Sequence, residues 1–167
     1  MNALAHAVEA TYTPMRNPVA TMAALRSVAL IAESLQPPDV DRSSLALGAL
    51  LAGYASGQTG YAVHHVVCQT IVRVGGTPHA ETNATMLPHS IRLMRDRAPD
   101  EIALVDAAMG EPEQIAARAG VTGLRALGFD PERVDAVVAA VLPRPELQNT
   151  PNAPGEAELR TFVKGAL

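Results

Sequence analysis

The chain has 167 residues, a formal net charge of −4, 48% hydrophobic residues and only 3% aromatic residues. This length predicts one domain that can bury a core without disulfides or a structural metal. The acidic and basic residues are interspersed, which excludes the basic surface that nucleic-acid binding requires. Cys68 is the only cysteine, so an internal disulfide is excluded and a reducing compartment is favoured. Neither a signal peptide nor an apolar run of about 20 residues is present, so we expect a soluble, cytoplasmic protein without a membrane partner.

Apolar residues recur every three or four positions along nearly the whole chain, and alternating β-branched runs bounded by turns are missing. This periodicity predicts an all-α fold. Asn17 and Pro18 mark the start of the second helix, and Asp41 or Ser43 can cap the third. The first four helices are expected at residues 2–11, 18–35 before Pro37-Pro38, 43–56, and from Gly57 or Gly60 to Val74.

The third and fourth predicted helices are almost free of charge from Ser43 to Ile71. We therefore expect them to form a buried hairpin at the centre of the domain. Proline, glycine and capping residues delimit the later elements. These are helices at 80–96 (kinked at Pro88), 99–110 and 111–119, a turn at 122–128 capped by Thr122, a helix at 130–142, an extended surface segment from Pro143 to Pro154, and a last helix at 155–164.

Histidines at helical spacing are the residues that most clearly indicate chemistry. Asn2 and His6 lie four positions apart, so on a helix they project from the same face. His65 and Gln69 repeat this spacing on the fourth predicted helix. The two pairs can therefore converge on one point.

A third segment can add His79 to this point. The run Gly75-Gly76-Thr77-Pro78 ends a helix and turns the chain, which can return His79 toward the first two pairs. Three imidazoles are used as ligands in open metal sites. The same residues can also form a buried polar cluster in which each side chain satisfies another, without any ligand.

Six segments carry a likeness to a known family, in matching order and at similar intervals. They are Met1–Glu9, Asn17-Pro18, His64–Cys68, Gly76–Thr82, Met86–His89 and Gly123–Gly128. Together they resemble the C-terminal helical domain of the iron-containing alcohol dehydrogenases, which is related to dehydroquinate synthase, and most closely the maleylacetate reductases. The resemblance extends over residues 1–167 and implies a helical domain that forms one wall of a cleft.

The resemblance also implies an opposite wall, a nucleotide-binding α/β domain that precedes the helical domain and binds NAD(P)H. The sequence contains no Gly-rich phosphate loop after a predicted strand. We therefore expect this domain to be absent, the cofactor-binding residues to be unknown here, and the chain to be inactive unless another chain supplies the missing wall. An uncovered cleft wall should be apolar, so we expect a homo-oligomer.

The position of Asn2 carries a carboxylate in the metal-dependent members of the family. Asparagine, which the maleylacetate reductases share, implies that Fe²⁺ or Zn²⁺ is possible but not required; His6, His65 and His79 would then be the ligands and Asn2 a weak one.

Without a metal, the resemblance makes His65 and His79 the catalytic residues. Asn2, His6, His64 and Gln69 are then the expected contacts of a small anionic substrate. His64 lies about 100° around the helix from His65, so it should face away from it.

The leading hypothesis is the helical half of a maleylacetate-reductase-like oxidoreductase, which reduces maleylacetate to 3-oxoadipate with NAD(P)H in the degradation of aromatic compounds. One alternative is a metal-dependent alcohol dehydrogenase domain. Another is a non-catalytic remnant or interaction module, because Gln69 and Asn83 replace histidines of the similar reductases and glutamine cannot relay a proton.

Overall fold

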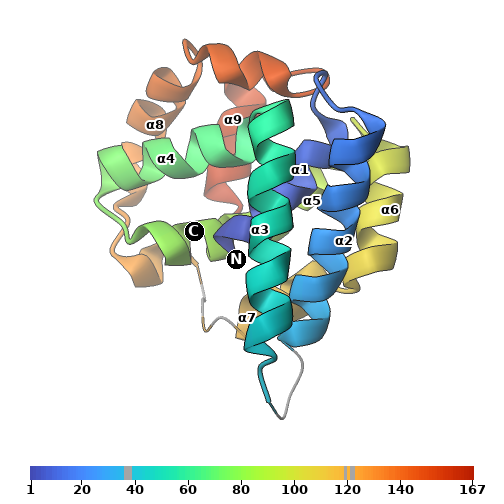
Figure 1. Ribbon diagram of the computed structural model, residues 1–167. Coiled ribbons are helices and arrows are strands. Elements are labelled where there is room, and N and C mark those ends of the chain that lie inside the picture. The colour runs from blue at the N-terminus through green and yellow to red at the C-terminus, as the bar shows by residue number, and fades with distance from the viewer. Residues whose placement is uncertain (36–38, 119, 121–122) are drawn as a thin grey trace.

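The computed structural model describes residues 1–35, 39–118, 120 and 123–167, and within these ranges it contains helices and turns but no strand (Figure 1). The predicted all-α fold is therefore confirmed. The elements are α1 (Asn2–Tyr12), α2 (Pro18–Ser34), α3 (Arg42–Thr59), α4 (Val63–Gly75), α5 (His79–Met94), α6 (Pro99–Met109), α7 (Pro112–Arg118), α8 (Val134–Val141) and α9 (Glu156–Lys164), with short 3₁₀ elements η1 (Arg125–Leu127), η2 (Pro131–Arg133) and η3 (Pro145–Asn149).

The first helices begin and end where the sequence signals place them. At the start of α2, the side-chain oxygen of Asn17 accepts a hydrogen bond from the Ala20 amide at 2.9 Å. Asp41 caps α3 by accepting from the amides that follow it. Gly76 ends α4 in the left-handed region with a φ of 74°. The predicted bounds from α1 to α6 agree with the structure to within about one turn, and α5 continues through Pro88.

The second half of the chain differs from the prediction in two places. The helix expected to start at Asp130 opens with the 3₁₀ turn η2, and α8 follows at Val134. The segment expected to be extended, 143–154, contains η3. Pro145 fixes φ at the first position of this turn, and the buried Leu147 side chain anchors it. Three predicted features lie outside the described residues: the break at Pro37-Pro38, the helix end near residue 119 and the cap at Thr122.

Helix α1 occupies the centre of the domain. Eight of its eleven residues are buried, and it contacts α2, α3, α4, α5 and α6. The expectation that α3 and α4 form the central pair is wrong for α3, which packs mainly on α2 and α1. Figure 1 shows α3 in front of α1 and beside α2, while α4 runs across the other side of the domain. A helix without charge can still lie at the surface when its exposed face is apolar.

The exposed side of α3 and the neighbouring part of α2 carry large apolar side chains. Leu50 is 69% exposed and Met22 is 72% exposed, and Val19, Leu47 and Tyr54 also lie at the surface. We call these five residues the α2/α3 apolar face. Although α3 has no charged residue after Arg42, no helix in the described part of the chain is both long and apolar enough to cross a membrane.

The close packing of α3 on α2 generates a stability prediction. A Cβ atom at Gly48 would lie 2.7 Å from Cγ1 of the buried Ile31, whereas a Cβ at Gly53 would meet no atom within 4 Å. Both glycines lie inside α3, so the gain in helix propensity on substitution by alanine is the same at each. Gly48→Ala should therefore be less stable than Gly53→Ala by about 1–3 kcal/mol, the usual cost of overpacking. Urea denaturation of the two variants measures this difference, and equal stabilities would contradict the packing described.

Candidate functional site

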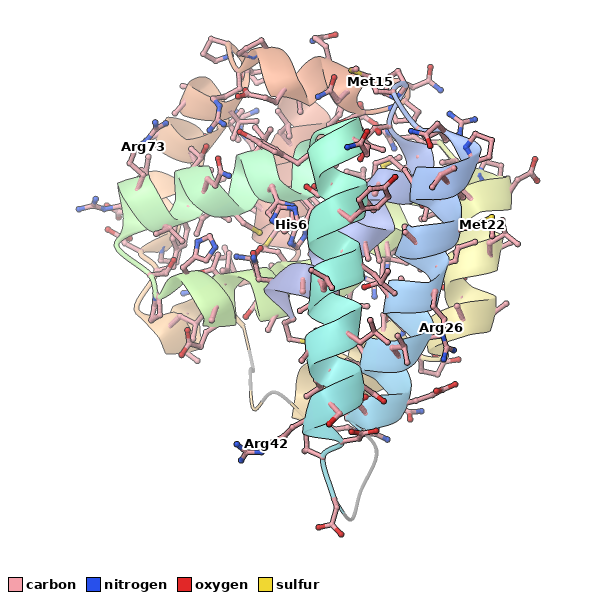
Figure 2. The ribbon with its side chains drawn as sticks, in the orientation of Figure 1. His6, Met15, Met22, Arg26, Arg42 and Arg73 are labelled. Atoms are coloured by element: carbon pink, nitrogen blue, oxygen red, sulfur yellow. The ribbon has the colours of Figure 1, made fainter. Side chains whose placement is uncertain are left out.

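Asn2, His6 and His65 meet where α1 passes the first turn of α4. The side-chain oxygen of Asn2 lies 3.3 Å from Nε2 of His65. The His6 ring is stacked on the His65 ring, with 3.6 Å between centroids and 13° between planes. Nδ1 of His6 is 3.1 Å from Oγ of Ser56, so α3 also holds this ring. Figure 2 shows His6 in the angle between α3 and α4.

His79 is the first residue of α5 and is exposed. It has an electrostatic effect on the pKa of both other histidines, His6 and His65. Burial is the main cause that lowers the pKa of His65 to about 4, and the charge of His79 is the second. Burial and then the charge of His65 lower the pKa of His6 to about 4, with His79 adding to this effect and Glu9 opposing it. The structure therefore brings together Asn2, His6 and His65 from α1 and α4, while His79 at the start of α5 acts on the two rings through its electrostatic effect.

Glu9 holds this arrangement in place, and the spacing of the histidines gave no indication of it. Its carboxylate is 1% exposed, one turn after His6 on α1. One oxygen accepts from the backbone amides of His64 and His65 at 2.7 and 3.3 Å. The other lies 2.6 Å from Nδ1 of His65. An acidic residue on the otherwise apolar, buried face of α1 is the signal in the sequence that could have revealed it.

The contacts of Glu9 determine which nitrogen of His65 carries the proton. Burial raises the pKa of Glu9, while the nearby His64 and the backbone amides at the start of α4 act in the opposite direction. The positive end of the α4 dipole favours the ionised carboxylate as well. An ionised carboxylate can only accept, so Nδ1 of His65 donates to it and Nε2 becomes an acceptor. Turning the side-chain amide of Asn2 by 180° exchanges the positions of its oxygen and nitrogen, so that its NH₂ group donates to Nε2 of His65.

The side chains, as they lie, do not fit a three-histidine metal centre. A nitrogen lone pair of imidazole lies in the plane of its ring, and the planes of His6 and His65 are nearly parallel and stacked. The two rings therefore cannot both direct a nitrogen at one ion about 2.0–2.1 Å away. Asn2 offers no negative charge to offset that of an ion. Within the described residues, no group of three or more histidine, cysteine or acidic side chains has the geometry of a metal site. A metal would require His6 to leave its stack.

The ring of His64 lies edge-on to that of His65, with 4.9 Å between centroids, but it points toward α5. The side chain is buried, Nδ1 is 2.8 Å from Oγ of Ser90, and Nε2 is 3.0 Å from the side-chain oxygen of Asn83. His64 and His65 thus have different partners, on α5 for His64 and on α1 for His65. Both rings are buried with both nitrogens engaged, and the role of His64 as a substrate contact stays a prediction. The side-chain nitrogen of Asn83 donates to the backbone carbonyl of His79 at 2.8 Å. This contact gives Asn83 a structural role at the start of α5.

Gln69 faces a cluster of polar side chains that spacing alone could not reveal. Its side-chain oxygen accepts from Nη2 of Arg144 at 3.1 Å, and the same Nη2 donates to the hydroxyl of Tyr61 at 3.2 Å. The Tyr61 ring packs against His65, with 6.0 Å between centroids. The Gln69 side chain is therefore held beside the site by Arg144, a residue 75 positions later in the chain.

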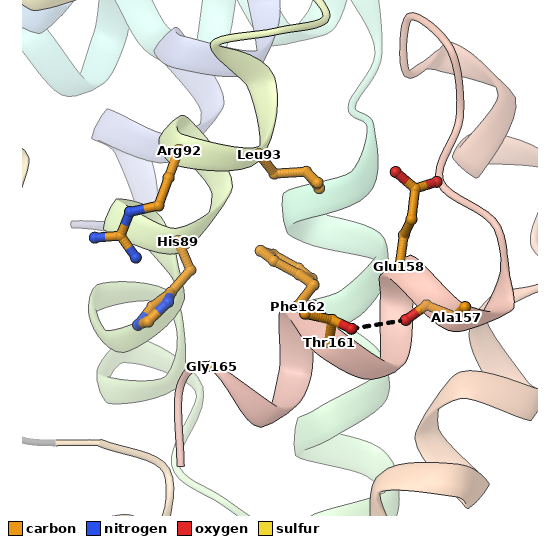
Figure 3. Close-up of a pocket in the computed structure, with 8 residues that line it drawn as sticks. All are labelled: His89, Arg92, Leu93, Ala157, Glu158, Thr161, Phe162 and Gly165. Atoms are coloured by element: carbon orange, nitrogen blue, oxygen red, sulfur yellow. Dashed lines mark hydrogen bonds between the residues drawn. The ribbon is translucent and has the colours of Figure 1, made fainter.

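A separate cavity of about 490 Å³ lies between α5 and α9 (Figure 3). His89, Leu93 and Phe162 are among the residues that line it. None of the histidines of the site described above lines this cavity, so it gives no support to their assignment.

The Glu9 contact predicts the tautomer of His65. In the native chain, long-range ¹H–¹⁵N spectra of the imidazoles should show His65 protonated at Nδ1. Glu9→Gln can keep the backbone contacts through its oxygen while presenting an NH₂ group to Nδ1, so His65 should change to the Nε2–H form. His64, which contacts α5, should keep its tautomer in the same sample. An unchanged His65 spectrum in the variant would contradict the role of Glu9.

The buried histidines predict how stability depends on pH. Burial lowers the pKa of His64 to about 3, and the pKa values of His6 and His65 are about 4, all below the ordinary value of 6.5. Between these values the unfolded chain binds more protons than the folded chain, so the free energy of unfolding should decrease as the pH falls from about 6.5 toward 4. Glu9, whose pKa is raised by burial, contributes in the opposite direction, and the three histidines together are expected to determine the net effect. Urea denaturation between about pH 5 and pH 7 tests this, and a stability that is constant or increases on acidification would contradict it.

Comparison with known proteins agrees with the helical architecture. Residues 1–166 match the Fe-containing alcohol dehydrogenase family, C-terminal. Maleylacetate reductase from Rhizobium sp. (strain MTP-10005) is 36% identical over 157 residues, which cover 87% of this chain and 45% of that protein. Maleylacetate reductase 1 from Rhodococcus opacus is 37% identical over 142 residues, which cover 77% of this chain and 40% of that protein.

The crystal structure of the Rhizobium maleylacetate reductase superposes with a TM-score of 0.88 and 32% identity, covering 99% of this chain and 50% of that one. The chain thus spans about half the length of the relatives it matches. Because the family match includes nearly every residue, the chain belongs to the Fe-containing alcohol dehydrogenase family, of which it forms the C-terminal helical domain.

Proposed function

We propose that this domain is the substrate-binding wall of a maleylacetate-reductase-like enzyme, in which NAD(P)H reduces the carbon–carbon double bond of a small unsaturated keto dicarboxylate. The observation that carries the proposal is the contact of Asn2 with His65 in a neutral, stacked histidine cluster. An uncharged cluster of this kind suits hydrogen bonding to a substrate better than holding a divalent ion. The identity to two maleylacetate reductases supports the choice of substrate class.

The histidines have complementary roles in this proposal. A dihydronicotinamide, when bound, supplies the hydride, which adds to the alkene carbon β to the ketone. Negative charge then moves to the ketone oxygen, and a proton must reach the α carbon. His79 is exposed and has no hydrogen-bond partner for its ring among the described residues, so it is placed to donate this proton. His65 orients the substrate when Asn2 releases its Nε2, and Glu9 keeps the neutral His65 ring in position.

The cofactor wall of the cleft is proposed to come from a nucleotide-binding α/β unit outside these 167 residues. The sequence contains no phosphate-binding loop of the expected kind. The relatives are about twice as long as the part that this chain matches. Such a unit, on the same polypeptide or on another, is the partner that this proposal requires.

A non-catalytic interaction module is the second candidate. It is favoured by Gln69, whose side chain is engaged by Arg144 and cannot relay a proton. An activity measurement separates the two functions, because an interaction module would remain inactive with any cofactor unit.

The test combines the chain with the nucleotide-binding half of the Rhizobium reductase, or with any nucleotide-binding segment that its own gene encodes, and follows NADH oxidation with maleylacetate. The chain alone should be inactive and the combination active.

His79→Ala should lower kcat by about 10²–10⁴, the usual contribution of a general acid. His89→Ala, a histidine on the same helix but in the α5/α9 cavity, should stay within about twofold of the native rate. Full activity of His79→Ala would contradict the proposed role, and turnover by the chain alone would contradict the need for a second unit.

The α2/α3 apolar face predicts self-association when nothing covers it. In sedimentation experiments at tens of micromolar, the chain should form a homo-oligomer, and Leu50→Glu, which places a charge at a 69% exposed position, should shift it toward monomer. Leu104→Glu is the matched control, because Leu104 is 52% exposed but lies on α6. A native chain that sediments as a clean monomer would contradict the prediction.

A further inference from the structure

Arg144 lies just after α8 at the start of η3, and its guanidinium reaches back to the segment around α4. Nη2 donates to Gln69 and to Tyr61, at 3.1 and 3.2 Å. Nε donates to a carboxylate oxygen of Glu146 at 3.1 Å. The Arg144 side chain is 20% exposed, so contacts from three elements hold it in place while one side remains open.

The Glu146 carboxylate shows what kind of group this cluster binds. One of its oxygens accepts from Arg144, and the other accepts from the Tyr61 hydroxyl at 3.1 Å. Arg144 and Tyr61 thus present two donors at the spacing of the two oxygens of one carboxylate. Glu146 itself is 33% exposed and sits on a short 3₁₀ turn, so it can move into solvent when another carboxylate takes its place.

This carboxylate-binding pair lies directly beside the histidine cluster. The Tyr61 and His65 rings meet at an angle of 61°, with 6.0 Å between centroids. Gln69 is one helical turn from His65 on α4, and its contact fixes Arg144 on the same side of the helix. A dicarboxylate bound beside the histidine cluster can therefore reach Arg144 with one end.

Arg144 places a positive charge beside the histidine cluster. An arginine is always charged, and its planar group can bind a carboxylate through two hydrogen bonds. Its hydrogen bonds to Gln69 and Tyr61 hold this permanent cation close to the histidine cluster, because the Tyr61 ring packs against His65.

We propose that Arg144 and Tyr61 form the subsite for one carboxylate of the substrate, and that Glu146 occupies this subsite in the free protein. Arg144 is then a specificity-determining residue that selects anionic substrates, and Glu146 is an internal competitor. The choice of a dicarboxylate substrate rests on the proposed function, but the carboxylate subsite itself rests on the contacts of these three side chains.

Binding to the full chain tests the subsite without any catalytic step. ¹H–¹⁵N spectra are recorded during titration with succinate, a stable dicarboxylate, up to about 50 mM at low ionic strength, where charge-assisted contacts are least screened. Succinamide is the uncharged control ligand. Arg26→Ala is the control variant, since Arg26 is an exposed arginine on α2, away from the site (Figure 2).

Succinate should shift the resonances of Tyr61, Gln69 and Arg144 in a saturable way, and succinamide should not. Arg144→Ala and Tyr61→Phe should weaken binding, the first by at least about tenfold, as expected for the loss of a charge-assisted contact. Glu146→Ala should strengthen it by about threefold or more, because it removes the competitor while leaving Arg144 intact. Arg26→Ala should bind as the native chain does.

Three results would each overturn the inference: no saturable shift in the native chain, equal binding by Arg144→Ala and Arg26→Ala, or no gain in Glu146→Ala. If Arg144→Ala does not fold, Tyr61→Phe and Glu146→Ala decide the question. A chain that binds succinate through Arg144 but never supports maleylacetate reduction would refute the proposed function and leave the subsite standing. Maleylacetate reduction that is unaffected by Arg144→Ala would refute the subsite and leave the proposed function standing.

Discussion

A buried carboxylate holds together the two helices on which the site depends. Glu9 of α1 is almost fully removed from solvent, and a charge in such a position must be paired and hydrogen-bonded. It obtains its partners from the first turn of α4, namely two backbone amides and the His65 ring. One side chain therefore caps α4, fixes its position against α1 and orients the central histidine. Asn2 and His6 are brought to His65 because they lie on the same helix as Glu9.

The neutrality of the histidines follows from this burial and determines what the site can do. Two stacked uncharged rings, with an asparagine beside one of them, present hydrogen-bonding nitrogens instead of a set of converging metal ligands. The positive charge that an anionic substrate needs must then come from elsewhere. We propose that Arg144 supplies it and that the exposed His79 is the group that exchanges protons with solvent. Binding and proton transfer are thus assigned to different side chains.

The sequence was sufficient for most helix limits and for the convergence of Asn2, His6 and His65, because caps, glycines and the four-residue spacing are local signals. It was not sufficient where a contact joins distant segments. The stacking of His6 on His65, the link from Glu9 to α4 and the link from Arg144 to Gln69 each depend on how helices pack, and no local pattern encodes them. The absence of charge in α3 was misleading for a related reason: it indicates an apolar helix but not what covers it. His64 shows the limit of spacing arguments, since spacing did not predict its burial between α4 and α5.

The most direct test of this account is a double-mutant cycle between Glu9 and His65. The free energies of unfolding of Glu9→Gln, His65→Gln and the double variant are measured by urea denaturation near pH 7. If the carboxylate and the imidazole depend on each other as described, the effects of the single substitutions should not add, and the coupling should be about 1–3 kcal/mol. Effects that add to within about 0.5 kcal/mol would show that Glu9 does not hold His65 in place, and would contradict the central claim.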